Sequence, residues 1–178
     1  MDNNSNYLKS VKQQFLYYKS LGDKSIAQLE PGMLFIQPNN ESNSIAMIIQ
    51  HMHGNMLSRW TDFLTTDGEK EWRRRDEEFE VILKTKEDVV NKWEEGWACL
   101  MNAIDNIKDS MLTEKILIRN EPHTVTEAIN RQLAHYPSHI GQIMFIGKML
   151  RGEKWQSLSI PKGKSTEYNA EKFSKPNP

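Results

Sequence analysis

The sequence contains one cysteine, Cys99, so a disulfide cannot form within the chain. It also lacks any apolar run that approaches the ~18 residues of a membrane-spanning helix. The first residues, MDNNSNYLKSV, have neither the basic start nor the apolar stretch of a signal peptide. These absences predict a cytoplasmic protein with no membrane partner, in keeping with the reducing compartment that a lone cysteine suggests.

An excess of charge of one sign is missing as well. The chain has 23 Lys and Arg residues against 24 Asp and Glu residues, which gives a net charge of −1. The basic run Arg73–Arg75 is followed directly by three acidic residues, so the local charges largely cancel. We therefore expect no nucleic-acid partner, and we interpret the charged segment 68–80 as a solvated loop or short helical turn anchored by Trp72 and Phe79.

What the sequence does contain is apolar residues at helical spacing. Hydrophobic residues make up 38% of the 178 positions, enough for one domain with a buried core. Their recurrence at steps of three and four residues predicts amphipathic helices over residues 5–30, 44–66, 86–108 and 124–150. Asn43 or Ser44 can cap the second of these helices and Thr85 the third. Thr124 can cap the fourth, with Glu127 completing a capping box.

These elements predict an all-α fold in which residues 1–160 form a four-helix bundle. The stretch TEKILIRNEPHTV, between the third and fourth helices, alternates in polarity around an Asn-Glu-Pro break. We expect a small hairpin or an irregular connection there. Residues 161–178 are rich in Lys, Ser and Pro and predict a mostly flexible C-terminal tail.

Two of the five histidines, His135 and His139, lie four residues apart in the predicted fourth helix. This spacing puts both rings on one face, with Cβ atoms roughly 5–6 Å apart, where they can bind one metal ion. Such a pair alone is more often packed or at the surface than bound to metal. Pro137 lies between them and is expected to kink the helix, either to set the angle between the rings or as a packing bend.

The second helix adds His51 and His53, at a depth that can meet the fourth helix in a bundle. The two differ by about 200° around the helix axis, so they cannot both face one ion. His53 lies about 70° from the centre of the apolar stripe and His51 about 130° from it. His51, however, shares a mixed polar face with Asn55 that suits the lining of a cavity. Helical spacing alone leaves the choice open.

Three segments together resemble the DinB/YfiT-like superfamily, most closely an uncharacterised bacterial branch of it. They read IIQHMHGNMLSRWTDFLTTDGEKEWRRRDEEF, LAHYPSHIGQIMFIGKML and WQSLSIPKGKS, and the resemblance covers roughly residues 5–168. It implies an up-down-down-up four-helix bundle in which three histidines hold a divalent metal ion, nickel or zinc. Matched residue by residue, the metal ligands fall on His51, His135 and His139. His53 occupies a position that the family pattern does not require.

Members of this superfamily with known activity are thiol-dependent transferases and isomerases that use bacillithiol, mycothiol or glutathione. The resemblance therefore implies a metal-dependent enzyme, a thiol S-transferase of the bacillithiol type, with a low-molecular-weight thiol as substrate. A three-histidine site leaves a coordination position open for that thiol. From helical spacing, we expect Asn55 and Gln142 to orient substrate or a metal-bound water, and Arg59 to pair with a carboxylate of the thiol.

Two alternatives remain open at this point. A metal-dependent hydrolase would need a general base, and no Asp or Glu lies within one helical turn of any of the three histidines. A non-catalytic, stress-related metal-binding bundle would use an exposed apolar helix face to form a homodimer. The five Trp and nine Met residues could supply that face, and a homodimer is also our expectation for the enzyme.

Overall fold

The chain folds into helices with one small hairpin. The computed structural model describes residues 6–80 and 82–174. The α-helices in this part are α1 Asn6–Ala27, α2 Ile45–Trp60, α3 Lys86–Asn106, α4 Val125–Arg151 and α5 Ser165–Phe173. The hairpin strands are β1 Lys115–Ile118 and β2 Glu121–Thr124. The prediction of a mostly helical fold is confirmed, and none of the described helices is long and apolar enough to cross a membrane.

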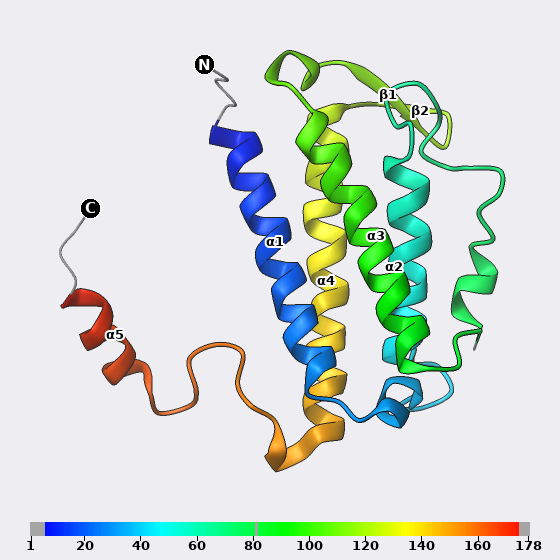
Figure 1. Ribbon diagram of the computed structural model, residues 1–178. Helices are drawn as coiled ribbons and strands as arrows, with labels where there is room; N and C mark the ends of the chain where they lie inside the picture. The colour runs from blue at the N-terminus through cyan, green and yellow to red at the C-terminus, as the bar shows by residue number, and fades with distance from the viewer. Residues whose placement is uncertain (1–5, 81, 175–178) are drawn as a thin grey trace.

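The four long helices lie side by side, with α1 and α4 running in one direction and α2 and α3 in the other (Figure 1). α2 packs mainly on α3, and α1 mainly on α4, while α2 also contacts α4. Large side chains from all four helices fill the space between them, among them Phe15, Ile49, Trp97, Leu100 and Ile140. The contact between α2 and α4 matters most for function, because these two helices carry the histidines of interest.

The predicted helix starts are confirmed by their capping hydrogen bonds. Ser44 is the N-cap of α2, and its hydroxyl oxygen accepts a backbone N–H of the first turn. Thr85 caps α3 in a capping box with Asp88. Thr124 caps α4, and Glu127 completes the predicted capping box. Because a cap satisfies N–H groups that the helix itself leaves unpaired, it fixes where each helix begins and hence which way its side chains face.

The second helix ends six residues earlier than predicted, at Trp60. Asp62 adopts a φ of 47°, in the left-handed region, which breaks the helical path. Beyond it the chain is tied to the hairpin, since the Gly68 N–H donates to the Leu117 carbonyl over 2.8 Å. The Asp67 carboxylate also accepts two backbone N–H groups of the hairpin turn. These long-range hydrogen bonds replace the helical ones, which apolar spacing alone does not reveal. α1 and α3 also end short of the predicted limits, by three and two residues.

The small hairpin expected between the third and fourth long helices is present. β1 and β2 pair antiparallel, with Ile118 opposite Glu121. The turn consists of Arg119 and Asn120, whose φ values of 55° and 60° are those of a tight hairpin turn with both central residues left-handed. The break expected at Asn-Glu-Pro is therefore displaced, since Pro122 belongs to β2. Proline is tolerated there because each strand of a two-stranded sheet is an edge strand.

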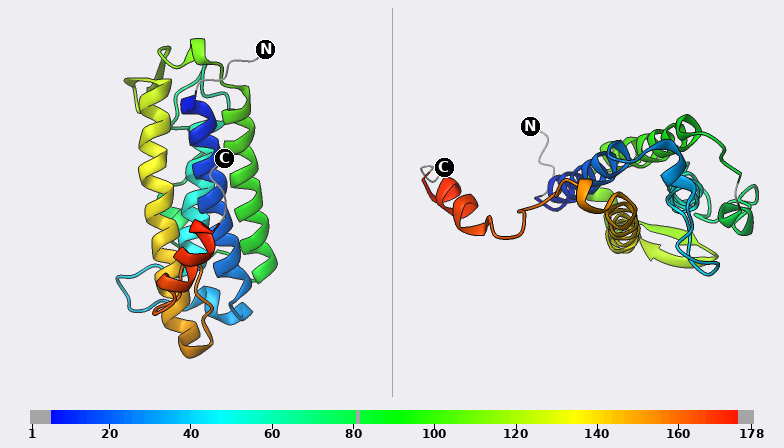
Figure 2. Two further views of the ribbon diagram at one scale, coloured as in Figure 1. Left: turned by 90° about the vertical axis from the view of Figure 1, so that its left-hand side faces the viewer. Right: turned by 90° about the horizontal axis from the view of Figure 1, so that it is seen from below.

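The C-terminal segment, for which the sequence predicts a mostly flexible tail, contains a helix, α5. Every residue from 161 to 174 is exposed, and α5 lies away from the four long helices (Figure 2). Residues 175–178, the end of the predicted tail, lie outside the described residues. A separate role for the segment in stabilising the fold is thus not expected.

Deleting residues 165–178 is expected to leave the stability of the protein nearly unchanged. The described residues of this segment bury no side chain, and changes at exposed positions usually alter the free energy of unfolding by less than about 0.5 kcal/mol. For a chain of this length, that corresponds to a Tm shift below about 2 °C. Thermal unfolding followed by circular dichroism measures it. A loss of more than about 5 °C would mean that the segment packs against the rest of the chain.

Candidate metal centre

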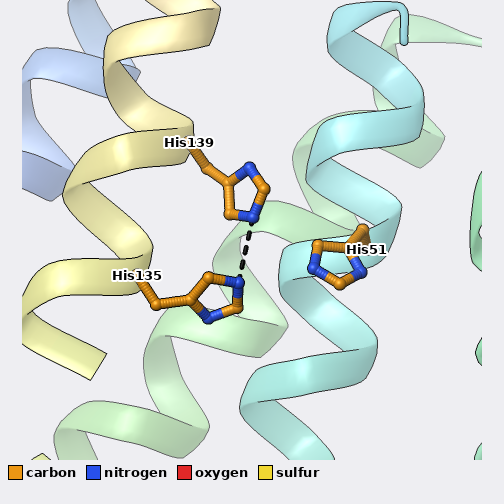
Figure 3. Close-up of side chains that lie close together, drawn as sticks. All are labelled: His51, His135 and His139. Carbon is orange, nitrogen blue, oxygen red and sulfur yellow. Dashed lines mark hydrogen bonds between the residues drawn. The ribbon is translucent and has the colours of Figure 1, made fainter. Parts of the chain in front are cut away.

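Three histidines from two facing helices meet between α2 and α4. His51 projects from α2, and His135 and His139 project from successive turns of α4 (Figure 3). One ring nitrogen of each histidine lies within 4.8 Å of those of the other two. His51 is 6% exposed, and the two rings of α4 are half-buried. The three residues named by the family resemblance therefore lie close together and could hold a metal ion.

Each ring is held by a side-chain oxygen that faces its Nδ1 atom. The pairs and their nitrogen–oxygen distances are His51–Glu78 at 2.9 Å, His135–Gln132 at 3.1 Å and His139–Gln142 at 2.9 Å. Because carboxylate and amide oxygens only accept hydrogen bonds, these contacts favour the tautomer with the ring proton on Nδ1. The Nε2 atom of each neutral ring then carries a lone pair. Figure 3 shows the second nitrogen of each ring turned toward the common centre.

The Nε2 atoms of His135 and His139 are 3.0 Å apart. Two lone pairs at this distance repel each other unless a cation lies between them. A proton is a poor candidate, because burial, followed by the neighbouring imidazoles of His139 and His51, lowers the pKa of His135 to about 3. Burial lowers the pKa of His139 as well. A tetrahedral ion with bonds of about 2.0–2.1 Å separates its ligand nitrogens by about 3.3 Å. The donor atoms and their spacing therefore fit a divalent metal ion.

Glu78 is the buried acid that orients His51. Arg73 donates to it through Nε at 2.7 Å and Nη2 at 2.9 Å, one bond to each carboxylate oxygen. Burial alone would raise the pKa of the Glu78 carboxyl, but the hydrogen bonds from His51 and Arg73 hold it below its usual value. Phe79 stacks on the His51 ring, with 5.0 Å between the two ring centroids. Such outer contacts fix the tautomer and orientation of metal-binding histidines in known sites.

Gly54 provides the space that Glu78 occupies against α2. A Cβ atom at this position would lie 2.8 Å from the Glu78 Cδ atom. Gly54→Ala is therefore expected to displace a carboxylate held by two partners and to lower the free energy of unfolding by about 1–3 kcal/mol. Gly141→Ala is the matched control, because its Cβ would meet nothing within 4 Å. Alanine there is expected to stabilise α4 by about 0.5–1 kcal/mol. Denaturant unfolding measures both, and equal effects would contradict a close approach at Gly54.

His53 faces away from the three-histidine centre. Its Nε2 atom lies 2.8 Å from the carboxylate of Glu95 on α3. The structure therefore agrees with the family pattern, which places His51 at the centre, and not with the slight preference of the apolar stripe for His53. The stripe is a poor guide because α2 is buried almost all round by its neighbours, so that both histidines are covered.

The three residues expected to contact substrate lie in different surroundings. Asn55 is buried near the centre, and its Oδ1 atom accepts a hydrogen bond from the Tyr136 hydroxyl over 3.1 Å. Arg59 is buried further along α2 and pairs with Glu69 at 3.2 Å. Gln142 holds an imidazole ring through its oxygen, so a direct role in orienting substrate is not required to explain it.

Sequence reasoning missed three residues that hold the centre. Gln132 lies three residues before a histidine on the same helix, so helical spacing could have found it. Arg73 and Glu78 belong to the charged segment interpreted as a solvated loop, yet both are buried. The expected anchor Trp72 is instead 54% exposed. The segment is therefore pinned by an ion pair together with Phe79, and no local signal in the sequence distinguishes these two charges from their neighbours.

A cavity of about 250 Å³ opens beside two of the three histidines, His51 and His135. Its remaining lining is polar or positively charged and consists of Asn55, Arg59, Arg73, Arg75, Arg119, Arg131 and Gln132. A small ligand in this cavity would contact the centre directly. The arrangement thus combines a candidate cation site with an adjoining space.

Comparison with known proteins gives a family but no activity. No curated protein matches the chain. A family model, described as a protein of unknown function (DUF1572), matches residues 2–164, a range that includes all three histidines, their Nδ1 partners and the cavity. Since this match spans most of the sequence, the chain belongs to the DUF1572 family.

Proposed function

We propose that this protein is a metal-dependent enzyme with a three-histidine divalent-metal site in a DinB-like four-helix bundle of up-down-down-up arrangement. The ligands are His51, His135 and His139, and the ion is nickel or zinc. The observation that carries the proposal is the pair of Nε2 atoms at 3.0 Å, each on a ring whose Nδ1 lies within hydrogen-bond distance of a side-chain oxygen. The bundle arrangement is supported by the helix directions, because α1 and α4 run in one direction and α2 and α3 run in the opposite direction.

The proposed reaction is a thiol S-transfer of the bacillithiol type. Three protein ligands leave a position open, and a divalent ion bound there would lower the pKa of a coordinated thiol or water. The chain's own residues orient the histidine rings and bind the thiol. Glu78, Gln132 and Gln142 hold the rings, and Arg59 and Asn55 face the bound thiol from the cavity. A cytoplasmic location is part of the proposal, because low-molecular-weight thiols are kept reduced there.

Metal-dependent hydrolysis is the weaker enzymatic alternative. It needs a carboxylate or imidazole free to take a proton from water. Glu78 is the acid nearest the centre in the contacts described above, but His51 and Arg73 engage both of its oxygens. Its ionised carboxylate therefore acts on the far side of the His51 ring and not at the open position.

A non-catalytic dimeric metal-binding protein is the alternative from another class, and we also propose a homodimer for the enzyme. The Trp and Met residues do not form the apolar face expected for it, since most of those described are buried or half-buried. Exposed apolar side chains do occur on α4, where Phe145 is 70% and Met149 49% exposed. Sedimentation velocity of wild type and Phe145→Glu tests this surface. A wild-type monomer at micromolar concentration would contradict the homodimer.

The catalytic proposal is tested with cobalt-substituted protein and a panel of thiols. Bacillithiol, mycothiol or glutathione is expected to give a sulfur-to-cobalt charge-transfer band that saturates with the thiol. The same thiol should then be consumed in the presence of an alkylating electrophile, because its sulfur forms a bond to carbon while the leaving group departs from the electrophile. The same reaction in aqueous buffer without thiol is the blank for hydrolysis of the electrophile. Cobalt that binds with no thiol-dependent band would favour the non-catalytic alternative.

A further inference from the structure

Five arginines from separate parts of the chain line the cavity beside the histidines. Arg59 lies on α2 and Arg131 on α4. Arg119 lies in the hairpin turn, and Arg73 and Arg75 belong to the charged segment that follows α2. Residues distant in sequence thus bring guanidinium groups to one small space. Charges of one sign repel each other, so their convergence calls for an explanation.

The carboxylates in contact with these arginines do not balance them. Glu69 pairs with Arg59, with Arg119 and, at 3.6 Å, with Arg73, and Glu78 pairs with Arg73. Five guanidinium groups therefore face two carboxylates, an excess of three positive charges. In the described part of the chain, Arg131 has no ion pair with a carboxylate, and Arg75 instead lies 5.5 Å from the centroid of a phenyl ring. Among the described residues that line the cavity, none is acidic.

The inner wall of the cavity is built of buried side chains with unused donors. Arg59 is only 6% exposed, and its Nε–H has no hydrogen-bond partner among the described residues. Asn55 is equally buried, and its oxygen is taken by the Tyr136 hydroxyl. This bond turns the Asn55 oxygen toward Tyr136 and leaves its NH₂ group as a donor. A buried guanidinium is stable only when its N–H groups have acceptors, and an anion in the cavity would supply an acceptor for the Arg59 Nε–H.

We propose that this cavity binds a small organic anion with two or more negatively charged oxygen groups, carboxylate or phosphate, as the substrate of the neighbouring metal centre. Its anionic groups contact Arg59, Arg75 and Arg131, and its reacting end lies toward His51 and His135. The role as substrate rests on the proposed function, whereas anion binding itself does not depend on a metal ion. Arginine suits this task because its planar fork binds carboxylate and phosphate through two parallel hydrogen bonds.

Size and charge favour a small molecule over a nucleic acid. The volume of about 250 Å³ lies just below the range of about 300–1,000 Å³ typical of sites for drug-sized ligands. The net charge of the chain is −1, so the positive charge is local to the cavity and does not extend into a general basic surface. Binding is expected to weaken with ionic strength, since three of the five arginines are exposed and their charges are screened by salt.

Calorimetric titration of metal-free and metal-loaded protein tests the proposal. The probes are inorganic phosphate and succinate, with succinamide as the neutral control of equal size. Arg75→Gln and Arg131→Gln are each expected to weaken binding about tenfold, and the double variant about a hundredfold. Arg74→Gln is the matched control, because this residue is also exposed and next in sequence but lines a different cavity. It should change the affinity less than twofold.

Different results separate this proposal from the proposed function. Saturable binding of phosphate or succinate that is lost in the double variant supports the anion site, and the tighter probe identifies the chemical source. Equal binding of succinamide, equal loss in Arg74→Gln, or tighter binding of a short single-stranded oligonucleotide would overturn it. Metal content is measured on the same samples. Protein that binds metal but neither anion would refute only the anion site, while protein that binds anions but no metal would refute only the metal-dependent function.

Discussion

Replacing His51, His135 or His139 with alanine is expected to reduce bound metal from about one equivalent per chain to near zero. Each variant leaves two imidazoles, and a site with two protein ligands in this position holds its ion far less tightly than one with three. Elemental analysis of protein purified in the presence of nickel or zinc measures the loss. Retention of a full equivalent in any of the three variants would remove that residue from the site.

His53→Ala is the matched control for these three variants. His53 lies on the same helix as His51 and is similarly buried, but it contacts Glu95 on α3 instead of the centre. It should keep its full equivalent of metal. Circular dichroism should show unchanged helix content in all four variants, so that metal loss is not mistaken for unfolding.

Thermal unfolding measures the loss of metal binding independently of elemental analysis. A ligand that binds only the folded state at a hundred times its Kd stabilises that state by about 2.7 kcal/mol. For a chain of this length, the Tm of the wild type should rise by roughly 5–10 °C on saturation with metal. The alanine variants at the three ligand positions should show no such rise, whereas His53→Ala should match the wild type.

Most of the helical framework could be predicted because its signals are local. Apolar spacing gave the four long helices, and the caps at Ser44, Thr85 and Thr124 gave their starts. The end of α2 could not be predicted, because it depends on hydrogen bonds between the following loop and a hairpin about fifty residues away in sequence. A helix end that depends on distant partners cannot be recognised from the spacing of apolar residues.

The candidate site shows the same division. The pair on α4 follows from spacing, but the choice of His51 over His53 needed the family resemblance, because the apolar stripe slightly favours His53, which contacts Glu95 and not the other two histidines. The contact of Glu78 with His51 spans 27 positions and arises when the charged segment folds back over Gly54. Nothing in the sequence distinguishes Glu78, which is buried, from the acidic residues beside it. The family resemblance identifies the three histidines, whereas the residues that orient their rings are identified only by the structure.

Glu78→Gln is expected to produce two large effects at once. It keeps the shape of the side chain but removes the nearer of the two carboxylates paired with the buried Arg73 and leaves only Glu69, at 3.6 Å. Breaking a buried ion pair costs about 3–5 kcal/mol of stability. It also weakens the hold on the His51 Nδ1–H, and loss of such a partner lowers metal affinity about 10–100-fold. Denaturant unfolding of metal-free protein measures the first effect, and competition with a chromogenic chelator measures the second. Glu77→Gln, at the exposed neighbouring position, should change neither.

A double variant separates the two roles of Glu78. Replacing a buried ion pair by apolar side chains of similar volume is often neutral or stabilising, so Arg73→Met with Glu78→Leu should recover most of the stability lost in Glu78→Gln. It restores no acceptor for the His51 ring, however, so metal affinity should stay low. If the double variant instead binds metal as tightly as the wild type, Glu78 serves only to neutralise Arg73, and Phe79 stacking must suffice to orient His51. If both stability and affinity stay low, the Arg73–Glu78 pair shapes the loop itself, and the histidine is oriented through that loop.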